Sequence, residues 1–135
     1  MKRHLLSSVL ILLFFLSFTN INAQLSPEGK TYKAHLSSVC KKMEGGGCNV
    51  DTYQVMEFIK DKVIIYRLVK ASCTPKERED SYNNKEEPIK YTRYWSVKDN
   101  KLFIEKYDEY GKMEIKDAKI IAKKETSVTE FIEEK

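Results

Sequence analysis

The chain is poor in histidine, which limits the catalytic chemistry that it can support. It has two histidines in 135 residues, and His4 belongs to the basic N-terminal start. Nucleophilic catalysis by serine or cysteine needs a histidine beside the nucleophile. His35 is the remaining candidate, and the alternation around it directs it outward. No spacing singles out a pair of carboxylates either, so we expect a non-enzymatic protein without catalytic residues or a cofactor.

The chain also lacks an apolar run of membrane-spanning length. It starts with Lys2 and Arg3, passes through a mainly apolar stretch at 9–18, and reaches Ala23 before it turns polar. A transmembrane helix needs about 20 apolar residues, whereas a basic start, a short apolar core and a small-residue exit are typical of a signal peptide. No cysteine near the exit could carry a lipid anchor. We therefore predict that residues 1–23 are removed after Ala23, which makes the protein secreted or periplasmic without a stable membrane anchor.

A strong excess of one charge is missing once residues 1–23 are removed. These residues carry two basic side chains and no acidic one, so residues 24–135 hold 22 basic and 20 acidic side chains, a formal charge of +2. The two signs are interspersed, whereas nucleic-acid binders gather basic residues on one face. We therefore expect no nucleic-acid partner. The 112 residues that remain suit a single domain.

Helical periodicity is absent after Ala23, because no segment keeps a 3.6-residue apolar stripe for three turns. Short runs rich in Val, Ile, Tyr and Phe occur instead, separated by turn signals. The expected strands are residues 32–39, 53–59, 63–69, 89–97, 102–107, 113–115, 118–122 and 128–132. This pattern predicts an all-β domain over residues 24–135, an antiparallel up-and-down meander of about eight strands that closes into a barrel.

Two segments interrupt the strand pattern. Residues 41–49 contain three consecutive glycines, which have no strand preference, and no Lys-Ser/Thr pair follows them as a phosphate-binding loop would require. We expect a flexible loop there. In the second segment, Thr74, Pro75 and Glu77 have the spacing of a capping box with proline at the first helical position. A short helix over residues 75–82 is expected, with a solvated loop as the alternative.

Three cysteines, Cys40, Cys48 and Cys73, remain after the predicted cleavage. In a meander they gather at one end of the barrel, since each lies at the rim end of its strand. We expect a disulfide between Cys48 and Cys73, with Cys40 and Cys48 as the runner-up, and one thiol left over. The spacing does not match the short C-x-x-C pattern of metal sites, so no metal is expected.

Residue parity in two strong strands suggests a ligand site. Val63, Ile65, Arg67 and Val69 share one face of their strand, and Ile89, Tyr91, Arg93, Trp95 and Val97 share one face of theirs. If these faces point inward, they bring two arginines into an apolar and aromatic barrel, where they could hold a ligand with an acidic head. We name Arg67, Tyr91, Arg93 and Trp95 as ligand-binding candidates. Two alternatives stay open: the opposite faces point inward, or the arginines lie at the mouth and reach water.

The eight-run meander resembles the small lipocalin-like domains of secreted bacterial proteins. The resemblance rests on residues 29–32 (Gly-Lys-Thr-Tyr), 94–97 (Tyr-Trp-Ser-Val) and 102–105 (Leu-Phe-Ile-Glu). It implies an up-and-down barrel with an internal pocket, although fold alone does not carry function. The expected function is a non-enzymatic binding module for a small apolar or anionic ligand. The alternative is a structural or interaction protein with a filled core that acts through its surface or a free thiol. The oligomeric state stays open.

Overall fold

The computed structural model describes residues 25–83 and 87–135, so the predicted signal peptide lies outside the described residues. The strands are β1 (Thr31–Met43), β2 (Gly46–Ile59), β3 (Lys62–Thr74), β4 (Tyr91–Lys98), β5 (Lys101–Ile104), β6 (Lys112–Lys116), β7 (Lys119–Lys124) and β8 (Ser127–Glu133). Neighbours in sequence pair antiparallel, and β8 returns to β1 to close a barrel. The predicted all-β meander of eight strands is confirmed.

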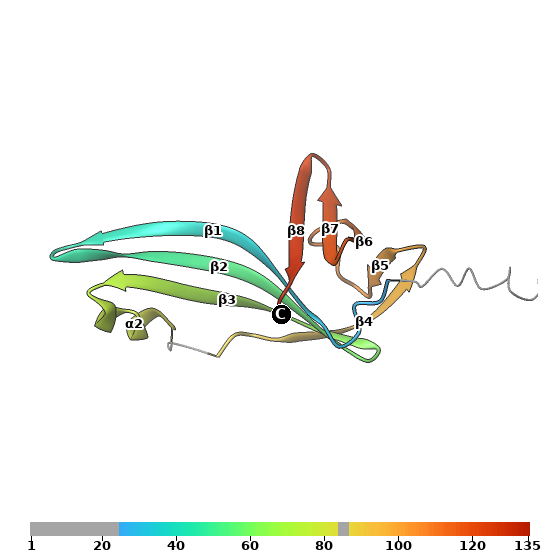
Figure 1. Ribbon diagram of the computed structural model, residues 1–135, viewed down its shortest axis with the longest axis horizontal. Coiled ribbons are helices and arrows are strands. Elements are labelled where there is room, and N and C mark those ends of the chain that lie inside the picture. Colours follow the sequence, from blue (N-terminus) through green and yellow to red (C-terminus); the bar gives the residue numbers. More distant parts are fainter. Residues whose placement is uncertain (1–24, 84–86) are drawn as a thin grey trace, which may run out of the picture.

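Three of the strands extend beyond the barrel. The strands β1, β2 and β3 have 13, 14 and 13 residues, but β8 pairs only with Tyr32 and Lys33 of β1, and β4 pairs only with residues 62–65 of β3. Their remaining halves project together as a three-stranded sheet, toward the left in Figure 1. We call this sheet the arm. It comprises residues 37–43, 46–52 and 69–74, which are aligned by the strand register.

The barrel core is built by alternation along each strand. Buried apolar side chains are supplied by every second residue, among them Met56, Phe58, Val63, Ile65, Leu102, Met113, Ile115, Ile120 and Phe131. The ring of Phe58 packs edge-to-face against Tyr32 and Trp95, with centroid distances of 5.8 and 5.4 Å. Such aromatic pairs add to the free energy gained by burial. The barrel around Phe58 is therefore filled with side chains.

Tight two-residue turns join most neighbouring strands. Residues 60–61 connect β2 to β3, and residues 99–100 connect β4 to β5. Asp99 and Asn100 both have positive φ, 52° and 59°. Positive φ at both central residues belongs to the type I′ turn, whose twist matches that of the flanking strands. Asn and Asp tolerate this conformation better than most residues, which explains their place in this turn.

Residues 41–49 form the end of the arm. The prediction of a flexible loop at the three glycines is therefore wrong. The strand β1 runs to Met43 and β2 starts at Gly46, so Glu44 and Gly45 alone make the turn. A Cβ atom on Gly46 would collide with the backbone carbonyl of Thr74. Glycine thus permits the close approach of β2 and β3, and the glycine run serves strand pairing.

The expected helix near residues 75–82 is present as two short turns, η1 (Lys76–Arg78) and α2 (Asp80–Asn83). Its predicted start is wrong in detail. Pro75 is the N-cap residue, and no side chain caps the first turn, so the capping box expected from Thr74 and Glu77 does not form. The two turns lie beside the end of β3 in Figure 1.

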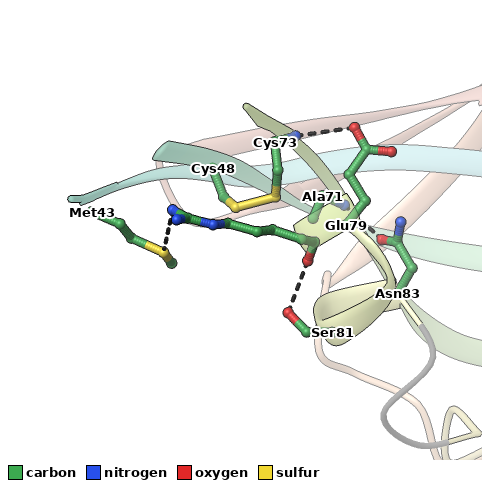
Figure 2. The surroundings of a disulfide bond; sticks show 8 residues. Met43, Cys48, Ala71, Cys73, Glu79, Ser81 and Asn83 are labelled. Carbon is green, nitrogen blue, oxygen red and sulfur yellow. Dashed lines mark hydrogen bonds between the residues drawn. A yellow bond between two sulfur atoms is a disulfide. The ribbon is translucent and has the colours of Figure 1, made fainter. Parts of the chain in front are cut away.

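The arm carries a disulfide between Cys48 of β2 and Cys73 of β3, which confirms the preferred pairing (Figure 2). The two residues are directly opposite in the strand register, and their Cα atoms are 4.1 Å apart. The runner-up pair of Cys40 with Cys48 is wrong, because the register places Lys41 opposite Cys48. Cys40, one residue away, points to the other face of the arm. Its thiol is free and exposed.

Replacing Phe58 by alanine should lower the free energy of unfolding by about 3–5 kcal/mol, because a large cavity would open in the core. Phe58 is 1% exposed, whereas Phe103 is 54% exposed. Phe103→Ala is therefore the matched control, with an expected change of about 0.5 kcal/mol or less. Urea unfolding followed by the fluorescence of Trp95 measures both variants. Equal losses in the two variants would contradict the described core.

Candidate functional site

A cavity of about 570 Å³, called here the arginine cavity, opens where β3 and β4 separate. The two strands pair as far as Ile65 and Tyr91, and β3 then continues into the arm without β4 (Figure 1). Arg67, Tyr91 and Arg93, three of the four predicted ligand-binding residues, line this cavity. They meet because Arg67 continues the inward face of Ile65, and the other two continue the inward face of Trp95.

The two arginines differ in their partners. Arg67 Nη2 lies 2.9 Å from Glu109 Oε1, and the Arg67 side chain is 62% exposed, so it reaches water at the mouth. Arg93 Nη1 donates to the carbonyl oxygen of Thr92 at 3.0 Å, and its guanidinium lies 5.9 Å from the ring centroid of Tyr91. Among the described residues, Arg93 forms no salt bridge. It therefore carries a positive charge that no carboxylate of the described residues compensates.

Polar groups also reach the inner wall of the arginine cavity. Gln54 is 3% exposed, its Nε2 donates to the Tyr66 carbonyl at 3.0 Å, and its Oε1 accepts from the Tyr110 hydroxyl at 3.4 Å. The Tyr107 hydroxyl is shielded from solvent and has no hydrogen-bond partner in the described part of the chain. Burial, with a smaller effect of the Glu109 charge, raises the pKa of Tyr107 far above its ordinary value. Tyr107 thus keeps its proton.

Trp95, the fourth predicted residue, lies away from the cavity lining. Its ring packs against Phe58 at a centroid distance of 5.4 Å and belongs to the filled part of the barrel. The indole Nε1 is buried without a hydrogen-bond partner among residues 25–83 and 87–135. The alternation in the sequence predicted which face of β4 carries Trp95. It did not predict how far along the barrel axis the residue lies. Trp95 therefore reports on core packing more directly than on the cavity.

A second cavity, of about 530 Å³, lies against β5, β6 and β7. Its lining includes the apolar side chains of Leu102, Phe103 and Met113 together with Lys101 and Lys112. The strands β5 and β6 share two register pairs only, which leaves this part of the wall thin. Sequence reasoning missed this cavity, although an exposed phenylalanine in an alternating strand was an available signal. It is a competing place for an apolar compound.

The sequence did not predict that His35, Ser38 and Asp51 come together across β1 and β2. His35 Nε2 lies 3.0 Å from Ser38 Oγ and 3.3 Å from Asp51 Oδ1, and the Ser38 hydroxyl donates directly to Asp51. These contacts lower the pKa of Asp51, the bond from Ser38 most. In a catalytic triad the histidine stands between the other two and uses both ring nitrogens. In this cluster the Nε2 atom of His35 contacts both Ser38 and Asp51. The histidine therefore does not stand between the two residues, as it would to activate a serine.

Two other kinds of site are absent from residues 25–83 and 87–135. No three side chains of His, Cys, Asp or Glu are grouped so that they could hold a metal ion. None of the helices there is both long and apolar enough to cross a bilayer. We therefore take the arginine cavity, which combines a cation with apolar walls, as the candidate functional site.

High pH should destabilise the protein through its buried tyrosines. An unfolded tyrosine ionises near a pKa of about 10, whereas burial raises the pKa of Tyr110 to about 12. Between these values the native state binds more protons than the unfolded state, so the free energy of unfolding falls as the pH rises. Tyr110→Phe should flatten this fall in urea midpoints measured from about pH 8 to 11. Tyr94→Phe, which changes a 54% exposed ring, is the control, and equal slopes in both variants would refute the expectation.

Comparison of the chain with protein-family models found no match. Comparisons with curated proteins and with solved structures found no match either. The function is therefore argued from the residues of this chain.

Proposed function

We propose that this protein is a non-enzymatic binding module that holds a small amphipathic anion in the arginine cavity. The observation that carries the proposal is Arg93, a cation without a salt-bridge partner among the described residues, at the wall of a cavity of about 570 Å³. Small-molecule sites are typically concave, mainly apolar and of about 300–1,000 Å³, with a few placed polar groups. The arginine cavity has the size and the composition of such a site.

The lining divides into two chemical parts. Ile65, Ile89 and Tyr91 supply apolar surface, which favours a ligand with a hydrocarbon or ring portion. Arg93 supplies hydrogen-bond donors for an acidic head group. A guanidinium can donate two parallel hydrogen bonds to a carboxylate, and such charge-assisted bonds are roughly twice as strong as neutral ones. The pattern suits a carboxylate attached to an apolar tail.

Arg67 has the smaller role in this proposal. Its charge is already balanced by Glu109 at 2.9 Å, so an anion that bound Arg67 would have to compete with that carboxylate. Because Arg67 is well exposed, water would also weaken a new ion pair there. The head group is therefore assigned to Arg93, and Arg67 with Glu109 forms the outer rim.

The proposed export of the protein agrees with this function. A disulfide in a small domain supports an oxidising compartment, which is consistent with the proposed cleavage after Ala23 and with a secreted or periplasmic location. The proposed relationship to small lipocalin-like domains of secreted bacterial proteins would supply a fold that often encloses a pocket. Neither point identifies the ligand, for which the cavity chemistry is the argument.

Calorimetric titration with decanoate and 1-decanol tests the proposal, because the two probes share a tail and differ in charge. The purified protein should bind decanoate saturably. Arg93→Gln should weaken decanoate binding about 10- to 100-fold, the value of a hydrogen bond to a charged group, and leave 1-decanol within about twofold. Arg78→Gln is the matched control, since Arg78 contacts Met43 and Glu44 at the far end of the arm.

Two results would contradict the assignment. The first is an absence of saturable decanoate binding. The second is binding that survives Arg93→Gln but is lost in Phe103→Ala, which would move the ligand to the second cavity.

A further inference from the structure

The two edges of the arm differ in whether their backbone hydrogen-bonding groups have partners. At the β3 edge, Asn83 Oδ1 accepts the backbone N–H of Ala71 at 2.8 Å, and Glu79 Oε1 accepts that of Cys73 at 3.0 Å (Figure 2). Side chains of the two helical turns thus satisfy amides that would otherwise face solvent. An unpaired strand edge is a template for adding another strand, and the β3 edge is blocked.

The β1 edge of the arm is open. The strand β8 pairs with Tyr32 and Lys33 only, and in the described part of the chain no strand pairs with the outer side of residues 37–43. A bulge between His35 and Ser37 separates this segment from the barrel wall. The regular open edge is therefore seven residues long, and Cys40 is its midpoint.

The direction of the β1 backbone groups follows from the strand register. The N–H of Cys73 points away from β2, because it donates to Glu79. The facing pair of Cys48 and Cys73 is thus not hydrogen-bonded, and the backbone groups of Cys48 point toward Lys41 of β1. Backbone direction alternates along an antiparallel strand. Ser38, Cys40 and Lys42 therefore present their N–H and C=O groups to the open edge.

We propose that this edge is a homodimer interface, in which residues 37–43 pair antiparallel with the same residues of a second copy around a two-fold axis at Cys40. This register uses the whole regular edge, and it would form roughly six backbone hydrogen bonds, two for each outward-facing pair. A two-fold axis also makes the interface closed and self-complementary, as in most homodimers. The proposal is independent of the ligand.

Charge favours the register centred on Cys40 over the registers centred on Lys41 or Lys42. An axis at Lys41 or Lys42 would place a lysine opposite its own copy, and like charges directly opposite are destabilising. With the axis at Cys40, Lys42 lies opposite the partner's Ser38 on the same face. The hydroxyl of Ser38 is bonded to Asp51, and the contacts around Asp51 lower its carboxyl pKa. Lys42 of each copy thus lies near the Asp51 carboxylate of the other copy. The two-fold axis makes this ion pair occur twice in the dimer.

The apolar contacts agree with this arrangement. Val39 is 52% exposed, and in this register it lies opposite the aliphatic stem of the partner's Lys41. Lysines and a bulge at an edge can also serve to prevent strand addition. That explanation predicts a monomer, whereas the symmetric register predicts a dimer in which each lysine has a favourable neighbour.

Sedimentation equilibrium of the purified, reduced protein is the first test. We expect a reversible monomer–dimer equilibrium, weakened about tenfold or more by Lys42→Glu, which places a carboxylate near the Asp51 carboxylate of the other copy. Asp51→Lys should weaken it similarly, and the double variant should restore it. A monomer at about 1 mM protein, or a double variant no better than the single ones, would overturn the proposal.

Disulfide trapping locates the axis. Oxidised glutathione would take two electrons and two protons from the two Cys40 thiols and be reduced to two glutathione molecules. The expected Cα separation of about 5.5 Å lies within the range of disulfides. Cys40→Ser should keep the reversible dimer without the covalent link. The variant with Cys40→Ser and Ser37→Cys is the matched control, since its thiols would be about 20 Å apart. Equal trapping in wild type and control would overturn this register.

Discussion

The pairing of β2 with β3 is the interaction on which the other features depend. It runs without interruption from Ile59 opposite Lys62 to Gly47 opposite Thr74. Its first half is barrel wall and its second half is the arm, so one register serves both. A shift of one residue would turn every side chain to the other face. The same register places Cys48 opposite Cys73 at one end and positions the strand face that carries the cavity at the other.

Alternation along single strands was enough to predict the barrel and part of the candidate site. The apolar residues of β3 and β4 repeat every second position, and this period is set by the backbone itself. It correctly directed Ile65 and Trp95 inward, whereas Arg67, on the same face as Ile65, reaches water at the mouth of the cavity. The disulfide followed from topology, because a meander returns the ends of neighbouring strands to one rim. These inferences needed only the chain order and a period of two.

Features that depend on contacts distant in sequence could not be predicted in this way. Glu109 pairs with Arg67 across 42 positions, and no local pattern marks either residue for the other. The bulge in β1 changes the parity that had placed His35 alone on the surface, and so it brings Ser38 and Asp51 to that histidine. The glycines at 45–47 indicate a loop locally, but pairing with β3 outweighs their poor strand propensity.

The cavity lies at the β3–β4 wall of the barrel, and the open edge lies on the arm. The arginine cavity is bounded by β3 and β4, whereas the open edge belongs to β1, which is two strands, or about 10 Å, farther across the sheet. A second copy paired at β1 would extend the sheet away from the cavity and join two arms into one six-stranded sheet. The helical turns at β3 would stop further addition there. Strand pairing would then give a closed dimer with both cavities open to solvent, because each arm has one free edge and one blocked edge.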